Sequence, residues 1–125
     1  MAATLTPGTT VVRNAACEPH VQDLCEFLSV LGARIEGGGT STIIIRGVKQ
    51  LRGGKHTIIP DPVNAMTFLI MGLATKSTIT VEHIRPDHLA VPLEVLLAAG
   101  ARFDIKKNSI TLKTSGLLKA MIVQT

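Results

Sequence analysis

The side chains of this sequence that most directly suggest chemistry include four histidines. These are His20, His56, His83 and His88, and they are spread over different predicted elements, with no His-x-x-x-His pair and no carboxylate cluster at ligand spacing. Metal ligands usually recur at short, fixed spacings. We therefore expect neither a metal ion nor another cofactor.

Two cysteines and a run of glycines have structural interpretations. Cys17 and Cys25 fit no common zinc motif and are too few for a disulfide scaffold, so we expect two reduced thiols. The run Gly37-Gly38-Gly39 leads into a predicted strand, whereas phosphate binds at helix N-termini. We expect a turn there.

Two carboxylates precede prolines, at Glu18-Pro19 and Asp61-Pro62. Proline is favoured at the first helical position because the N–H that it lacks would have no partner there. An acidic residue before it can accept hydrogen bonds from the next free N–H groups. Both contexts predict helix capping as the dominant role of Glu18 and Asp61.

Length and composition indicate a folded chain without a membrane segment. The 125 residues are 46% apolar and 18% charged, which is enough to bury a core. No apolar run reaches the ~20 residues of a membrane-spanning helix, and the N-terminus lacks signal-peptide features, which favours the cytoplasm. The net charge of +4 is scattered and lacks interleaved aromatic residues, so we expect no nucleic-acid partner.

The elements that position these residues occur twice. Residues 31–35 (LGARI) return 68 residues later as residues 99–103 (AGARF), and the same shift pairs Thr10 with Thr78 and Val11 with Ile79 without a gap. An internal repeat defines the building unit. The pattern is incomplete at both ends, so we expect the chain to be part of something larger.

Hydrophobic spacing and turn signals predict strands that alternate with helices. The predicted strands are residues 10–15, 33–36, 42–46, 56–60, 77–84, 101–105, 109–113 and 118–123. The predicted helices begin near Pro19, Pro62 and Pro86, and Pro92 within the third predicts a kink or a late start. This order favours helices against one face of a mixed sheet.

Several local motifs together resemble one enzyme family. They are residues 8–19 (GTTVVRNAACEP), 27–28 (FL), 31–33 (LGA), 39–40 (GT), 45–48 (IRGV), 56–61 (HTIIPD), 67–69 (TFL) and 85–89 (RPDHL). In register over essentially the whole chain, they resemble the UDP-N-acetylglucosamine 1-carboxyvinyltransferase family of enolpyruvyl transferases. The resemblance implies an α/β (α+β) fold, an inside-out α/β barrel of six βαβαββ repeats in two lobes, of which this chain holds an incomplete set.

The resemblance also implies domains and chemistry. Residues 1–58 would be the last repeat of one lobe, and residues 59–125 the first repeat of the other, with the active-site cleft between the lobes. The family transfers the enolpyruvyl group of phosphoenolpyruvate to the 3′-hydroxyl of UDP-N-acetylglucosamine and releases phosphate, in peptidoglycan synthesis. These two small molecules are the substrates that the resemblance implies.

Two of the family's cleft positions are present, and the resemblance implies a catalytic role for Glu18 and Asp61 beside capping. The second glutamate of the family's Glu-Pro-Glu motif is His20 here, and the arginine and glutamate of its Pro-Asp-Arg-Ile-Glu motif are Pro62 and Asn64. The family's loop cysteine, its N-terminal lysine-asparagine pair and its catalytic aspartate have no counterparts among the 125 residues, and neither cysteine occupies the loop position.

Two classes of function follow. The first is part of an enolpyruvyl transferase that has no activity as an isolated chain; within this class, the shikimate-pathway enzyme is the runner-up because it matches the motifs less well. The second is a non-catalytic binding module that has kept the repeat fold and self-associates or pairs with a complementary fragment, since incomplete repeats expose sheet edges and apolar helix faces.

Overall fold

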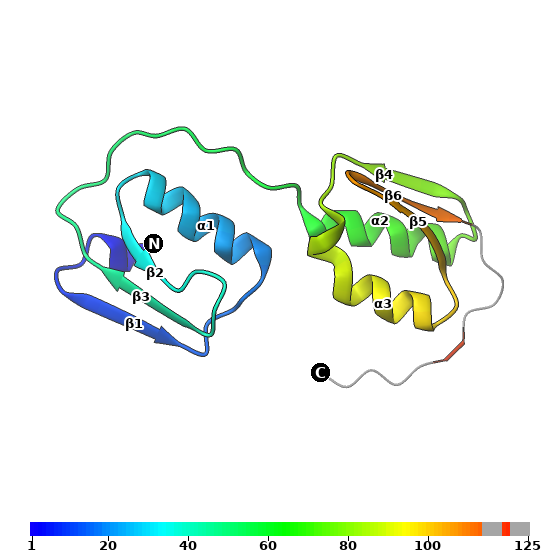
Figure 1. Ribbon diagram of the computed structural model, residues 1–125, viewed down its shortest axis with the longest axis horizontal. Helices are drawn as coiled ribbons and strands as arrows, with labels where there is room; N and C mark the ends of the chain where they lie inside the picture. Colours follow the sequence, from blue (N-terminus) through cyan, green and yellow to red (C-terminus); the bar gives the residue numbers. More distant parts are fainter. Residues whose placement is uncertain (114–118, 121–125) are drawn as a thin grey trace. The chain divides into compact units, whose positions relative to one another are not determined.

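The chain forms two compact units in the computed structural model, residues 1–59 (unit 1) and residues 60–125 (unit 2), drawn in Figure 1. The structure describes residues 1–113 and 119–120. The strand predicted over residues 118–123 lies outside these, apart from Lys119 and Ala120. Each unit is described by itself.

Unit 1 is a three-stranded sheet with one long helix on one face. Its elements are a 3-10 turn η1 (Ala2–Thr4), β1 (Thr9–Arg13), α1 (Pro19–Val30), β2 (Arg34–Glu36) and β3 (Thr42–Arg46). The sheet order is β1-β3-β2, with both pairs antiparallel. Its buried apolar residues are Leu28, Ala33, Ile43 and Ile45, so the core lies between α1 and the middle strand (Figure 1).

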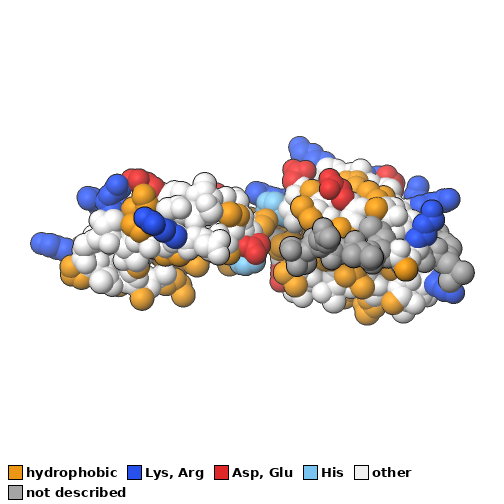
Figure 2. Space-filling view, turned by 90° about the horizontal axis from the view of Figure 1, so that it is seen from below, with side chains coloured by type: hydrophobic (Ala, Val, Ile, Leu, Met, Phe, Trp, Pro, Cys, Tyr) orange, Lys and Arg blue, Asp and Glu red, His pale blue; other side chains and the backbone are white. Residues whose placement is uncertain are grey.

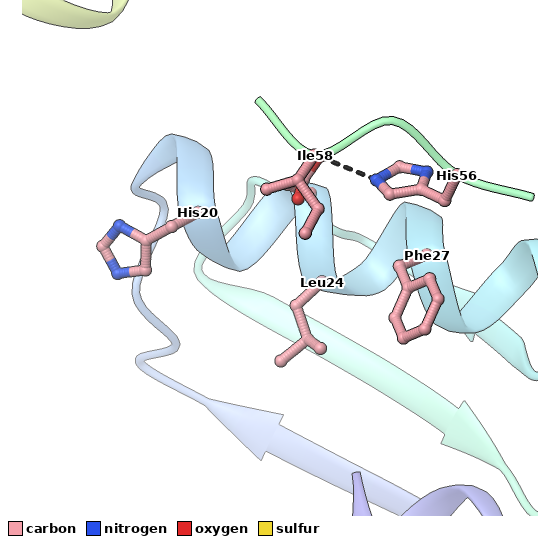
Figure 3. A pocket seen from close by; sticks show the side chains of 6 residues that line it. His20, Leu24, Phe27, His56 and Ile58 are labelled. Atoms are coloured by element: carbon pink, nitrogen blue, oxygen red, sulfur yellow. Dashed lines mark hydrogen bonds and ion pairs between the residues drawn. The ribbon is translucent and has the colours of Figure 1, made fainter. Parts of the chain in front are cut away.

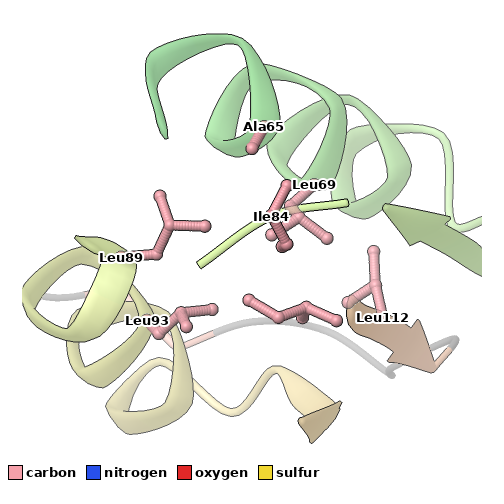
Figure 4. Close-up of a cluster of buried hydrophobic side chains, with 7 residues drawn as sticks. Ala65, Leu69, Ile84, Leu89, Leu93 and Leu112 are labelled. Carbon is pink, nitrogen blue, oxygen red and sulfur yellow. The ribbon is translucent and has the colours of Figure 1, made fainter. Parts of the chain in front are cut away.

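Unit 2 repeats this arrangement and has one additional helix, which precedes its first strand in the sequence. Its elements are α2 (Pro62–Ala74), β4 (Ile79–Glu82), a 3-10 turn η2 (Pro86–Leu89), α3 (Ala90–Ala98), β5 (Arg102–Lys106) and β6 (Ser109–Lys113), and the sheet order is β4-β6-β5. Both helices contribute to one buried cluster against β6 (Figure 4). The cluster is Ala65, Leu69, Ile84, Leu89, Leu93, Ile110 and Leu112.

The backbone confirms the internal repeat. Left-handed residues recur at matching places, at Gly8 (φ +98°) and Lys76 (φ +53°) and at Gly32 (φ +96°) and Gly100 (φ +100°), each pair 68 residues apart. Gly32 and Gly100 each follow the helix that leads into the second strand of the sheet, where a residue without Cβ adopts this conformation at little cost.

The pairing register of β1 and β4 shows that the two repeats do not align without a gap, as the sequence had suggested. Thr10 pairs with Ile45, and Ile79 pairs with Leu112. Ile79 therefore takes the place of Thr10 and not that of Val11. Because side chains alternate across a strand, this shift of one residue decides which of them faces the helices.

Two further expectations about the elements were wrong or incomplete. Residues 56–60, all described, form neither a helix nor a strand, because none of the described strands pairs with them. Among the described residues the sheets are not mixed, since every strand pair there is antiparallel. The late start predicted from Pro92 is confirmed, as η2 precedes α3 and Pro92 is the third residue of α3, where its missing N–H is tolerated.

Among residues 1–113 and 119–120, none of the helices has the length and apolar character needed to cross a lipid bilayer.

Candidate functional site

Asp61 is the N-cap of α2, and its side chain is held there by three hydrogen bonds. Asp61 Oδ1 accepts from the backbone N–H groups of Val63 (2.8 Å) and Asn64 (3.1 Å), and Oδ2 accepts from Asn64 Nδ2 (2.9 Å). By the resemblance given above, Asn64 replaces a glutamate of the family motif. An amide can donate to the Asp61 carboxylate, which a second carboxylate cannot do, so this exchange ties Asp61 more firmly to capping.

Glu18 is the N-cap residue of α1, but its side chain makes no capping hydrogen bond. The backbone carbonyl of Glu18 instead accepts from the N–H groups of Val21 (2.9 Å) and Gln22 (3.2 Å). The expectation that the Glu18 carboxylate caps the helix was therefore wrong. The glutamate carboxylate lies one methylene farther from the backbone than the carboxylate of aspartate, which caps well, and here the side chain is exposed to solvent. Glu18 belongs to unit 1 and Asp61 to unit 2.

A cavity of about 420 Å³ lies beside α1 in unit 1, where sequence reasoning placed no site. Its lining is mostly apolar, and the side chains come from α1 and from the segment that follows β3 (Figure 3). The lining residues are His20, Asp23, Leu24, Phe27, His56 and Ile58.

A histidine–aspartate pair is the polar centre of this cavity. His56 Nε2 lies 2.8 Å from Asp23 Oδ1, and the two side chains are only 13% and 12% exposed. The His56 ring also contacts the ring of Phe27, with centroids 5.7 Å apart and planes tilted by 47°. Burial from water makes such a hydrogen bond more favourable than it would be at the surface.

The pair fastens residues 49–59, here called the strap, along α1. At one end of the helix, the N–H of Arg52 donates to the carbonyl of Leu31 (2.7 Å). Gly54 then passes so close that a Cβ there would lie 2.7 Å from Val30 Cγ1. Because Asp23 and His56 are 33 residues apart and the strap has no periodic pattern, no local signal in the sequence predicts their contact.

The other charged groups offer little for catalysis. Arg34 and Arg102 are the first residues of β2 and β5 and are exposed, in equivalent positions. Within the described part of the chain, no group of three His, Cys, Asp or Glu side chains could hold a metal ion. On the face shown in Figure 2, basic side chains lie in several separate places on each unit.

Among the described residues, the Glu36–Arg46 pair and the Cys25 thiol have shifted pKa values. The Arg46 side chain lowers the pKa of the Glu36 carboxyl, first through a hydrogen bond and second through its charge. Burial raises the pKa of the Cys25 thiol, so that at neutral pH less of it is the nucleophilic thiolate. Neither group lies in the cavity beside α1.

Each unit is a sheet of order first-last-second strand with a crossover helix on one face, and this repeat defines the class of fold. A sequence model of the EPSP synthase family (3-phosphoshikimate 1-carboxyvinyltransferase) matches residues 1–125. The chain therefore belongs to that family.

Individual relatives carry more specific names than the family model does. A protein from Coxiella burnetii named UDP-N-acetylglucosamine 1-carboxyvinyltransferase is 47% identical over 116 residues, which are 93% of this chain and 27% of the relative. One of the same name from Methylacidiphilum infernorum is 43% identical over 125 residues, 100% of this chain and 30% of the relative. The enolpyruvyl transferase NikO from Streptomyces tendae is a structural neighbour with a TM-score of 0.73 and 28% identity, over 89% of this chain and 27% of that one.

These similarities confirm the expected enolpyruvyl transferase type of fold. The chain spans less than a third of the length of the relatives that it matches, so it corresponds to a fragment of them.

Proposed function

We propose that this chain supplies two repeat units to an enzyme that transfers an enolpyruvyl group from phosphoenolpyruvate to UDP-N-acetylglucosamine in the cytoplasm, for peptidoglycan synthesis. The observation that carries the proposal is the 43–47% identity to named UDP-N-acetylglucosamine 1-carboxyvinyltransferases over 93–100% of the chain. In this proposal residues 1–58 end one lobe and residues 59–125 begin the other.

The isolated chain is proposed to have no transferase activity, because the reaction needs more groups than it offers. A general acid must protonate the vinyl carbon, and a base must take the proton of the sugar hydroxyl. Cations must hold the phosphate, the carboxylate and the diphosphate. None of the six residues that line the cavity beside α1 is Lys or Arg, so this cavity does not fit such anionic substrates.

Within an intact enzyme, Glu18 is the better candidate of the two carboxylates for a role at the cleft. Its side chain makes no capping hydrogen bond at α1, whereas both oxygens of Asp61 are occupied at the start of α2. Asp61 would then act mainly by fixing the first turn of α2.

A chimera tests the proposal. The matching 27% of the Coxiella burnetii relative is replaced by this chain, and phosphate release from phosphoenolpyruvate is measured with UDP-N-acetylglucosamine. We expect activity from the chimera and none from the 125-residue chain alone. Shikimate 3-phosphate serves as the competing acceptor, and preference for it would assign the chain to the runner-up enzyme. A folded but inactive chimera, or an active isolated chain, would contradict the proposal.

A non-catalytic assembly module is the second candidate. The observation in its favour is the uncharged helix α2, on which Phe68, Ile70 and Met71 are each about half exposed. Exposed apolar side chains of this size are typical of protein interfaces. Sedimentation of the isolated chain as a monomer at high concentration would count against this module.

A further inference from the structure

The cavity beside α1 has the size of a small-molecule site. Its volume of about 420 Å³ lies in the range of roughly 300–1,000 Å³ that is usual for ligand pockets. Leu24 and Phe27 of α1 and Ile58 of the strap supply its apolar surface (Figure 3). All three side chains remain partly exposed, so this surface is open to a ligand.

The Asp23 carboxylate uses only one of its two oxygens within this cavity. Oδ1 forms the hydrogen bond with His56 Nε2 at 2.8 Å. Among the described residues no donor reaches Oδ2, and this oxygen does not belong to the side-chain atoms that are sealed from solvent. A molecule that fills the cavity covers Oδ2, and unless it donates a hydrogen bond there it leaves a carboxylate oxygen buried without a partner, which lowers affinity.

The charges around the cavity favour a cationic donor. Helix α1 carries Asp23 and Glu26 but neither Lys nor Arg, and Lys55 of the strap is exposed and does not line the cavity. A cationic donor binds a carboxylate more strongly than a neutral one, and the ring of Phe27 also attracts a cation. Because no group of three ligating side chains in the described part of the chain could hold a metal ion, the cation that fits is organic.

We propose that this cavity binds a small primary ammonium compound with a compact aromatic body. The ammonium group donates to Asp23 Oδ2, and the aromatic body lies against Leu24, Phe27 and Ile58. The hydrogen bond between His56 and Asp23 stays in place and holds both the carboxylate and the strap. Neither Glu18 nor Asp61 lines the cavity, so this site is independent of the proposed transferase function.

Three matched compounds test the site on the full chain. They are 2-phenylethylamine, 2-phenylethanol and 3-phenylpropionate, titrated at pH 8, where histidine is ordinarily neutral, while NMR follows the amides of α1 and the strap. We expect the amine to bind roughly tenfold or more tightly than the alcohol, and the carboxylate to bind most weakly. Equal affinity for amine and alcohol, or no shift at the His56 amide with any compound, would overturn the proposal.

The ratio of amine to alcohol affinity is then compared between variants. Asp23→Asn should bring this ratio close to 1, whereas Glu26→Gln, which removes an exposed charge from the same helix, should leave it unchanged. A ratio that stays high in Asp23→Asn, or falls equally in Glu26→Gln, would contradict the proposed site.

If Asp23→Asn binds neither compound, His56→Gln decides the matter, because it breaks the same pair but keeps the carboxylate. A preference for the amine in His56→Gln supports the site, and loss of that preference or of all binding overturns it.

Discussion

At the scale of single residues, Asp61 and Glu18 stand in similar sequences and do different things. Asp61 satisfies two N–H groups of α2 with one oxygen, while Glu18 satisfies none with its side chain. We expect Asp61→Ala to lower the free energy of unfolding of unit 2 by about 1 kcal/mol, and Glu18→Ala to change that of unit 1 by less than about 0.5 kcal/mol. Urea denaturation followed separately in each unit measures both. Equal losses would mean that the two caps are equivalent.

Glu36 and Arg46 face each other across the edge of the first sheet. Because Arg46 lowers the pKa of Glu36 in the folded state, the ion pair stabilises the fold at pH values above the unfolded pKa of the glutamate. This contribution is lost as the pH falls through the lowered folded pKa. In Arg46→Gln the pKa of Glu36 should rise toward its ordinary value in an NMR titration. An unchanged pKa would show that the guanidinium is not the cause.

At the scale of elements, the contact between α2 and its sheet depends on the absence of a side chain at Gly72. A methyl group there would meet Ile79 Cγ2 at 2.6 Å and Leu112 Cδ2 at 2.9 Å. Gly72→Ala gains up to about 1 kcal/mol of helix propensity but overpacks the core, which costs about 1–3 kcal/mol. We expect net destabilisation of unit 2 in thermal unfolding. Thr67→Ala, at an exposed position of the same helix, is the control and should not be destabilising.

The strap is held to α1 by few contacts, of which the His56–Asp23 pair is the most buried polar one. Asp23→Asn removes the charge while keeping the shape of the side chain, so the strap should detach more often and trypsin should cleave after Lys55 severalfold faster. Glu26→Gln removes an exposed charge from the same helix and is the matched control. Cleavage that is equally fast in both variants would show that the pair does not hold the strap.

At the scale of the whole molecule, the two units have cores of different quality. The cluster of unit 2 combines two helices with β6 and contains two residues that are 0% exposed, whereas α1 alone covers the sheet of unit 1. Larger buried apolar area gives greater stability. We expect unit 1 to unfold at a lower denaturant concentration than unit 2 when amide exchange is followed in each. One shared transition for all amides would contradict this.

Local sequence predicts well those features that depend on interactions between residues close together in the chain. Proline before a run of helical spacing correctly located α1 and α2, and Pro92 correctly predicted the late start of α3. The repeat was visible because Gly32 and Gly100 are required by backbone conformation, not by distant contacts.

The features that sequence reasoning missed depend on distant contacts. Residues 56–60 have the β-branched composition of a strand, but none of the described strands pairs with them, and His56 contacts α1 instead. Likewise, the contact between His56 and Asp23 joins residues that are far apart in sequence. The position of Glu18 indicated a cap, whereas the direction of its side chain could not be read from spacing.

The strand order also determines when each sheet can form during synthesis of the chain. In each unit the first strand to be made lies beside the last, so β1 pairs with β3 and β4 with β6. A ribosome adds roughly 5–20 residues per second, so β3 is synthesised about a few seconds after β1. During this time β1, with its exposed Val11 and Val12, has no strand to pair with. Helix α1 can form during that interval, but the sheet cannot. Each unit therefore closes in a single late step, and the nascent chain is most vulnerable to aggregation just before β3 and β6 emerge.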